Sequence, residues 1–179
     1  MNAFQTITGK AAKAGLPFLV IGGYAVMAHG FIRATEDLDL LAKASQRARW
    51  RELLEGLGMP LHHEGGTFLQ FKAPPSGRLP VDVMLVADEV FARMQSTAEL
   101  MRFESAEVGV VSLIQLIALK CHAIRHADKQ LRVLKDMDDL VHLIQLNGLD
   151  LRESELRTII LKHGNEDLYE KLQRACAAE

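Results

Sequence analysis

The chain of 179 residues is long enough for one domain or a small unit of two lobes, and its hydrophobic share of 49% is ample for a packed core. A net charge of −2 excludes a protein that holds nucleic acid through a strong overall basic field. The sequence contains no apolar run of membrane-spanning length, no signal-peptide pattern at its start, and no metal-binding spacing of its two cysteines. We therefore expect a cytoplasmic protein without membrane contact.

Hydrophobic periodicity divides the first half of the chain into helices and strands. Helices are expected over residues 2–15, 24–29 and 45–57. Strands are expected over residues 18–21, 38–42, 61–64, 67–71 and 80–86. Gly65-Gly66 between the third and fourth strands is typical of a hairpin turn, and Ser45 is the expected N-cap of the third helix. One or two helices are expected over residues 88–101.

From about Val111 the pattern becomes almost wholly helical. Helices are expected over residues 112–126, 129–147, 151–162 and 165–177. We therefore predict an α+β fold, with a mixed β-sheet and flanking helices in residues 1–110 and a helical C-terminal region packed on this core in residues 111–179. Apolar helix faces in the last third of the chain could bury in a homodimer.

Two aspartates stand at the start of the strand over residues 38–42. Asp37 and Asp39 are two positions apart, so their side chains point to the same face of the strand. Carboxylates held side by side repel each other, and a bound divalent cation relieves that repulsion. Upstream, Gly22-Gly23 opens a helix and offers backbone N–H groups to phosphate. Together these features indicate a metal-dependent site for a nucleoside triphosphate, with a plain tight turn and a solvent-facing Asp39 as the alternatives.

A third aspartate, Asp82, interrupts an otherwise apolar strand. An ionised aspartate is costly to bury unless it is paired or bound to a metal ion. If this strand lies beside the strand over residues 38–42, Asp82 joins Asp37 and Asp39. Three carboxylates converging on two Mg²⁺ ions meet the needs of two-metal phosphoryl transfer. The alternative is an exposed aspartate near the start of a strand.

The residues around the first two aspartates resemble a known signature. Its members here are Gly22, Gly23, Ala25, His29, Gly30, Arg33, Thr35, Asp37 and Asp39. The spacing is similar to that of the nucleotidyltransferase superfamily that includes DNA polymerase β, especially the small antibiotic nucleotidyltransferases and the abortive-infection toxin-like nucleotidyltransferases. This resemblance covers about two dozen residues in its core and implies a nucleotidyltransferase-like sheet.

The resemblance also implies roles for the acidic residues and the glycines. Asp37 and Asp39 would bind the metal ions, and Asp82 would be the third carboxylate, on the ion that activates the acceptor. The ions would be two Mg²⁺, with Mn²⁺ as an alternative. Gly23 stands where the superfamily usually has serine, so backbone N–H groups at Gly22 and Gly23 would hold phosphate without that hydroxyl.

Other nucleotide-binding candidates flank this core. Arg33 and Thr35 lie in the loop before the aspartates. Residues 118–144 resemble the segment that follows the core in the abortive-infection-like branch. By that likeness, Lys120 would contact the phosphates and Asp136 would be a further functional carboxylate. The alternatives are a surface arginine at position 33 and an amphipathic helix carrying i,i+4 ion pairs.

The function implied is that of an enzyme: a Mg²⁺-dependent nucleotidyltransferase that moves a nucleoside monophosphate from an NTP, such as ATP, to a hydroxyl and releases pyrophosphate. The acceptor stays open between a small antibiotic-like molecule, a tRNA and a protein side chain. The alternative is an interaction module of a toxin–antitoxin pair that has this fold but little or no catalysis. In that case the helical half would be mainly a surface for a partner protein.

Overall fold

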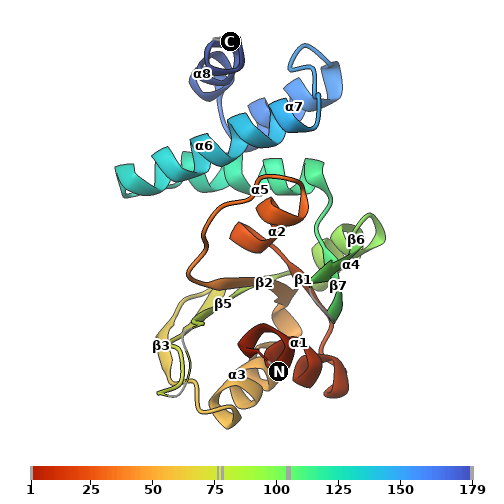
Figure 1. Cartoon of the computed structure of the whole chain (residues 1–179), viewed down its shortest axis with the longest axis vertical. Helices are drawn as coiled ribbons and strands as arrows, with labels where there is room; N and C mark the ends of the chain where they lie inside the picture. The colour runs from red at the N-terminus through yellow and green to blue at the C-terminus, as the bar shows by residue number, and fades with distance from the viewer. Residues whose placement is uncertain (1, 76, 78, 104–105, 178–179) are drawn as a thin grey trace. The chain divides into compact units, whose positions relative to one another are not determined.

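The computed structural model describes residues 2–75, 77, 79–103 and 106–177 (Figure 1). The described residues form helices and a seven-stranded sheet that divide into two compact units. The first unit comprises Met1–Ala25 and Arg33–Ser112, and the second comprises Val26–Ile32 and Leu113–Glu179. The predicted α+β fold with a mixed sheet is confirmed.

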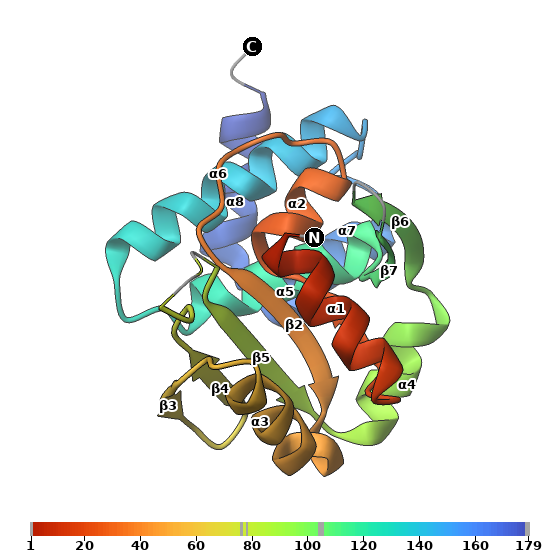
Figure 2. The same ribbon diagram turned by 60° about the horizontal axis from the view of Figure 1, so that its bottom comes forward.

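The whole sheet belongs to the first unit. Its strands are β1 (Phe18–Val20), β2 (Leu38–Lys43), β3 (Leu61–Glu64), β4 (Phe68–Phe71), β5 (Val81–Val86), β6 (Glu99–Phe103) and β7 (Ala106–Val110). They lie in the order β3-β4-β5-β2-β1-β7-β6, and the β2–β5 and β1–β7 pairs are parallel while the other neighbours are antiparallel. Figure 2 shows β2 and β5 side by side near the middle of the sheet.

The sequence explains why these two strands are central. In β2 the apolar residues Leu38, Leu40 and Ala42 are fully buried on one face, and Leu41 is buried on the other face as well. Strand β5 alternates strictly, with its odd-numbered residues buried and its even-numbered residues half-buried. Near-continuous apolar runs are typical of strands covered on both faces. A charged residue in either strand is therefore partly shielded from solvent.

The described part of the first unit also contains α-helices of nine or more residues. They are α1 (Ala3–Lys13), α3 (Arg47–Gly56) and α4 (Asp88–Ser96). The predicted N-cap at Ser45 is wrong, because Ser45 lies in a short 3₁₀ helix, Ala44–Gln46, just before α3. Its hydroxyl instead donates a hydrogen bond of 2.7 Å to the Asp88 carboxylate at the start of α4.

The prediction of helix through residue 101 is also wrong at its end. Helix α4 stops at Ser96, and Glu99–Phe103 forms the edge strand β6. Strand β6 pairs in antiparallel fashion with β7, which in turn pairs with β1. Backbone hydrogen bonding to a neighbouring strand thus overrides the local preference of this short segment.

The second unit is helical. It contains α5 (Leu113–Arg125), α6 (Gln130–Leu146), α7 (Ser154–His163) and α8 (Glu166–Cys176), which agree with the predicted helices within a few residues. Helix α2 (Gly22–Ala28) begins in the first unit and ends in the second. Burial in this helical core raises the pKa of the Cys121 thiol to about 12. Among the described helices, none combines the length and hydrophobicity that a membrane crossing needs.

Candidate active site

Three carboxylates meet on one face of the sheet. In the parallel β2–β5 pair, Asp39 lies directly opposite Asp82, and Asp37 immediately precedes β2. One oxygen from each of Asp37, Asp39 and Asp82 lies within 4.8 Å of the others, and all three residues are half-buried. The strand adjacency on which the sequence argument depends is therefore present in the structure.

This arrangement is electrostatically unfavourable by itself. Like charges separated by 4.8 Å repel by on the order of 3 kcal/mol per pair at an effective dielectric constant of ~20. An all-oxygen, triply acidic ligand set suits a hard divalent cation such as Mg²⁺ or Mn²⁺. The three carboxylates thus fit a metal ion, and they are the group among the described residues that could hold one.

Thr35 contacts the first of these carboxylates. Its hydroxyl lies 3.3 Å from Oδ1 of Asp37 and 3.4 Å from the Asp37 carbonyl oxygen, so it can donate a hydrogen bond to either. Since the two residues are only two positions apart, this contact closes the end of the loop just before β2. Thr35 therefore helps to fix Asp37, besides being a candidate for nucleotide contact.

Gln70 was not among the residues expected from the sequence. It lies on β4 opposite Asp82 and donates a hydrogen bond of 2.7 Å from Nε2 to Oδ2 of that aspartate. The signal was present in the sequence, because Gln70 is the single polar residue in the strand Phe68–Phe71. Only the order of the strands, which the sequence does not show, places Gln70 beside Asp82.

The glycine pair packs directly on the acidic site. Gly22 has a φ of +62°, which side-chain-bearing residues rarely adopt, and a Cβ atom there would lie 2.5 Å from Cγ of Asp39. A Cβ atom on Gly23 would lie 2.8 Å from Cβ of Thr35 and 3.4 Å from Nη1 of Arg33. The first unit therefore brings together the two glycines, Arg33, Thr35 and the carboxylates, and it does so only because positions 22 and 23 lack side chains.

Lys120 and Asp136 belong to the second unit and are held in an ion-pair cluster. The Lys120 Nζ lies 2.7 Å from Oδ1 of Asp136 and 2.5 Å from Oδ2 of Asp139, and all three residues are buried. The i,i+4 contact from Arg132 to Asp136 is longer, at 3.8 Å. Asp139 is the most buried member of this cluster.

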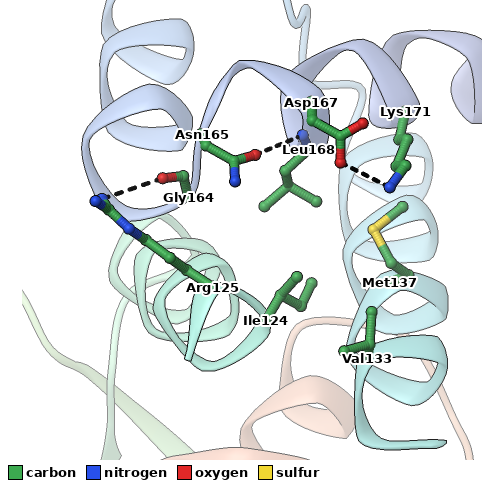
Figure 3. Close-up of a pocket in the computed structure, with 9 residues that line it drawn as sticks. All are labelled: Ile124, Arg125, Val133, Met137, Gly164, Asn165, Asp167, Leu168 and Lys171. Atoms are coloured by element: carbon green, nitrogen blue, oxygen red, sulfur yellow. Dashed lines mark hydrogen bonds and ion pairs between the residues drawn. The ribbon is translucent and has the colours of Figure 1, made fainter. Parts of the chain in front are cut away.

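The second unit also contains a hollow of about 240 Å³ between α5, α6 and α8 (Figure 3). Four of its lining side chains are apolar, and the lining also includes the Asp167–Lys171 ion pair and Arg125. It is lined by Ile124, Arg125, Val133, Met137, Gly164, Asn165, Asp167, Leu168 and Lys171. Since its one carboxylate is already paired, this hollow has none of the features of the acidic site.

Comparison with known sequence families identifies the chain. Residues 10–176 match the family described as nucleotidyl transferase AbiEii toxin of a type IV TA system. The chain belongs to the AbiEii family. This membership confirms the resemblance seen in the sequence and the prediction that the protein is a nucleotidyltransferase. A comparison with curated proteins gives no match.

Solved structures with a similar fold include several nucleotidyltransferases. The antibiotic-resistance factor ANT(2'')-Ia in its solution structure is 16% identical over 98% of this chain and 96% of that chain, with a TM-score of 0.63. An antigenic nucleotidyltransferase-like protein from Paracoccidioides brasiliensis is 17% identical over 100% and 95%, with a TM-score of 0.57. The lincosamide antibiotic adenylyltransferase LnuA, bound to lincomycin, is 13% identical over 78% and 95%, with a TM-score of 0.56. At these identities the likeness shows the fold of this AbiEii-family chain.

Proposed function

We propose that this AbiEii-family protein transfers a nucleoside monophosphate from an NTP to a hydroxyl group in a Mg²⁺-dependent reaction. A bond would form between the acceptor oxygen and the α-phosphorus, the bond from the α-phosphorus to the bridging oxygen would break, and pyrophosphate would leave. The observation that carries the proposal is the convergence of Asp37, Asp39 and Asp82 beside a glycine turn, in a chain whose family is a nucleotidyltransferase family.

The carboxylates of Asp37, Asp39 and Asp82 would hold two Mg²⁺ ions, or Mn²⁺ in their place. When bound, such ions lower the pKa of a hydroxyl and neutralise the charge of a triphosphate. The chain itself contributes rigidity, because two of the three ligands are fixed on adjacent strands. A preorganised site of this kind does not have to be assembled during the reaction.

The nucleotide would be held by groups around the glycine turn. Backbone N–H groups at Gly22 and Gly23 can approach phosphate closely because neither residue has a side chain of its own. The Arg33 guanidinium lies beside Gly23 and offers positive charge to the same phosphates. Roles for Lys120 with phosphate, and for Asp136 as a further carboxylate, are proposed on the family resemblance.

The test is titration of each of the four NTPs into the purified protein, with and without Mg²⁺, beside the Asp37→Ala/Asp39→Ala double variant. We expect saturable binding that requires Mg²⁺ and that the double variant loses, because the variant removes two of the three carboxylates. Binding that is equal in the variant and independent of Mg²⁺ would refute the metal site. The NTP that binds most tightly then serves as the nucleotide donor in a screen for the acceptor.

The substitution Gly23→Ala, which adds one methyl group, tests whether phosphate binds at the Gly22-Gly23 turn. Gly23→Ala keeps an ordinary helical backbone but must displace Thr35, so we expect NTP affinity to fall roughly tenfold while the protein stays folded. Gly9→Ala is the matched control, because a Cβ atom on Gly9 meets nothing within 4 Å. Isothermal titration of both variants with NTP makes the comparison. Unaltered NTP affinity in Gly23→Ala would refute phosphate binding at this turn.

The family description supports a second proposal, in which the protein acts as the toxin of a toxin–antitoxin pair, recognised by a partner protein. Expression of wild-type protein and of the Asp37→Ala/Asp39→Ala variant in bacteria separates the two mechanisms. If growth arrest depends on nucleotide transfer, the variant is harmless at equal protein level. If the protein acts as an interaction module, the variant still arrests growth.

A further inference from the structure

Gln70 is placed to act on the acidic site through Asp82. The two residues face each other across the antiparallel β4–β5 pair, and Asp82 in turn faces Asp39 across the parallel β5–β2 pair. Residues opposite each other in adjacent strands project to the same face. Gln70, Asp82 and Asp39 therefore form one row across three strands, on the face that carries the proposed metal site.

The direction of the hydrogen bond is fixed by chemistry. The Asp82 carboxylate can only accept, so the atom of Gln70 that lies 2.7 Å from Oδ2 is the amide nitrogen. The side chain is half-buried, and its neighbours Leu69 and Phe71 are buried on the opposite face of β4. The amide is thus directed along the row by the register of the sheet.

We propose that Gln70 is a positioning residue that sets the orientation of the Asp82 carboxylate for the metal ion, an inference that rests on the proposed function. A carboxylate on a short side chain can rotate about its last bond, and its repulsion by Asp37 and Asp39 favours turning away. The donor on Gln70 opposes that rotation by holding one oxygen. Groups that orient metal ligands in this way contribute roughly 10- to 100-fold to metal affinity or activity.

The test compares Mn²⁺ binding to five forms of the full chain: wild type, Asp39→Asn, Gln70→Met, Gln70→Asn and Gln145→Leu. Methionine has nearly the length of glutamine but no donor, and Gln145 is a half-buried glutamine on α6 that serves as the matched control. Free Mn²⁺ is measured by electron paramagnetic resonance without nucleotide, so the readout does not depend on turnover. Thermal unfolding without metal shows whether each variant is folded.

We expect Gln70→Met to weaken Mn²⁺ binding at least tenfold with little change in the unfolding temperature, and Gln145→Leu to bind as wild type does. Gln70→Asn, which keeps the amide but cannot span the distance, should weaken binding similarly and guards against a packing effect of methionine. If Asp39→Asn loses binding and both Gln70 variants match wild type, the role of Gln70 is refuted and the proposed function stands. If wild type itself fails to bind, or Asp39→Asn binds equally well, the metal site fails and the inference fails with it.

Discussion

Replacing Asp39 with asparagine is expected to lower the rate of nucleotide transfer by roughly 10³-fold, or about 4 kcal/mol of transition-state stabilisation, while leaving the fold intact. Asparagine has nearly the same shape as aspartate, so β2 can keep its pairing with β5. The variant removes the carboxylate that faces Asp82 and packs on Gly22, and with it one negative charge of the three that would bind the metal ions. Initial rates at saturating NTP, measured over a range of Mg²⁺ concentrations, check the prediction.

The control is Asp88→Asn, the same chemical change at a half-buried aspartate of the first unit that lies outside the acidic site. Asp88 bonds to Ser45 at the start of α4, and that hydrogen bond lowers the pKa of the Asp88 carboxyl below its ordinary value. Loss of the Asp88 carboxylate should leave the rate of nucleotide transfer and the Mg²⁺ dependence of that rate unchanged. Equal activity of Asp39→Asn and wild type across the Mg²⁺ range would exclude Asp39 as a metal ligand.

The centre of the site could be predicted because its signal is local in the sequence. Alternation along the expected strand predicts that Asp37 and Asp39 share a face, and Asp82 is conspicuous as the one charge in an apolar strand. The sequence does not contain the pairing of β2 with β5, which supplies the contact between these segments. The prediction therefore had to assume that pairing, and the family signature made the assumption reasonable.

Features that depend on strand order could not be predicted in the same way. Gln70 gains its partner only because β4 lies beside β5 in the register that places it opposite Asp82. Likewise, Glu99–Phe103 is a strand because β7 lies beside it, and over five residues its pattern does not separate helix from strand. The ion pair from Lys120 to Asp139 joins two helices, whereas spacing along one helix suggested only neighbours on that helix.

That buried cluster is the basis of the largest expected effect on stability. Lys120→Met should lower the free energy of unfolding of the helical unit by about 3–5 kcal/mol, because it leaves Asp136 and Asp139 buried without their shared cation. Lys171→Met is the matched control: Lys171 makes an ion pair of 2.6 Å with Asp167, but both side chains are more than half exposed. Exposed pairs contribute about 0–1 kcal/mol, so the same substitution there should cost little.

The measurement can separate the two units, since the single Trp50 lies in the first and most of the helix lies in the second. Urea unfolding followed by circular dichroism at 222 nm should show the lower free energy of unfolding of Lys120→Met. The same unfolding followed by Trp50 fluorescence should show a smaller decrease. Adding Asp139→Asn to Lys120→Met should recover part of this lost stability, because it removes one of the two buried carboxylate charges that Lys120 pairs with in the wild type. If Lys120→Met lowers the free energy of unfolding no more than Lys171→Met does, burial does not make the Lys120 ion pairs more important for stability than an exposed pair. The recovery expected in the double variant would instead show that charge, rather than the volume of the lysine side chain, stabilises the packing of α5 against α6.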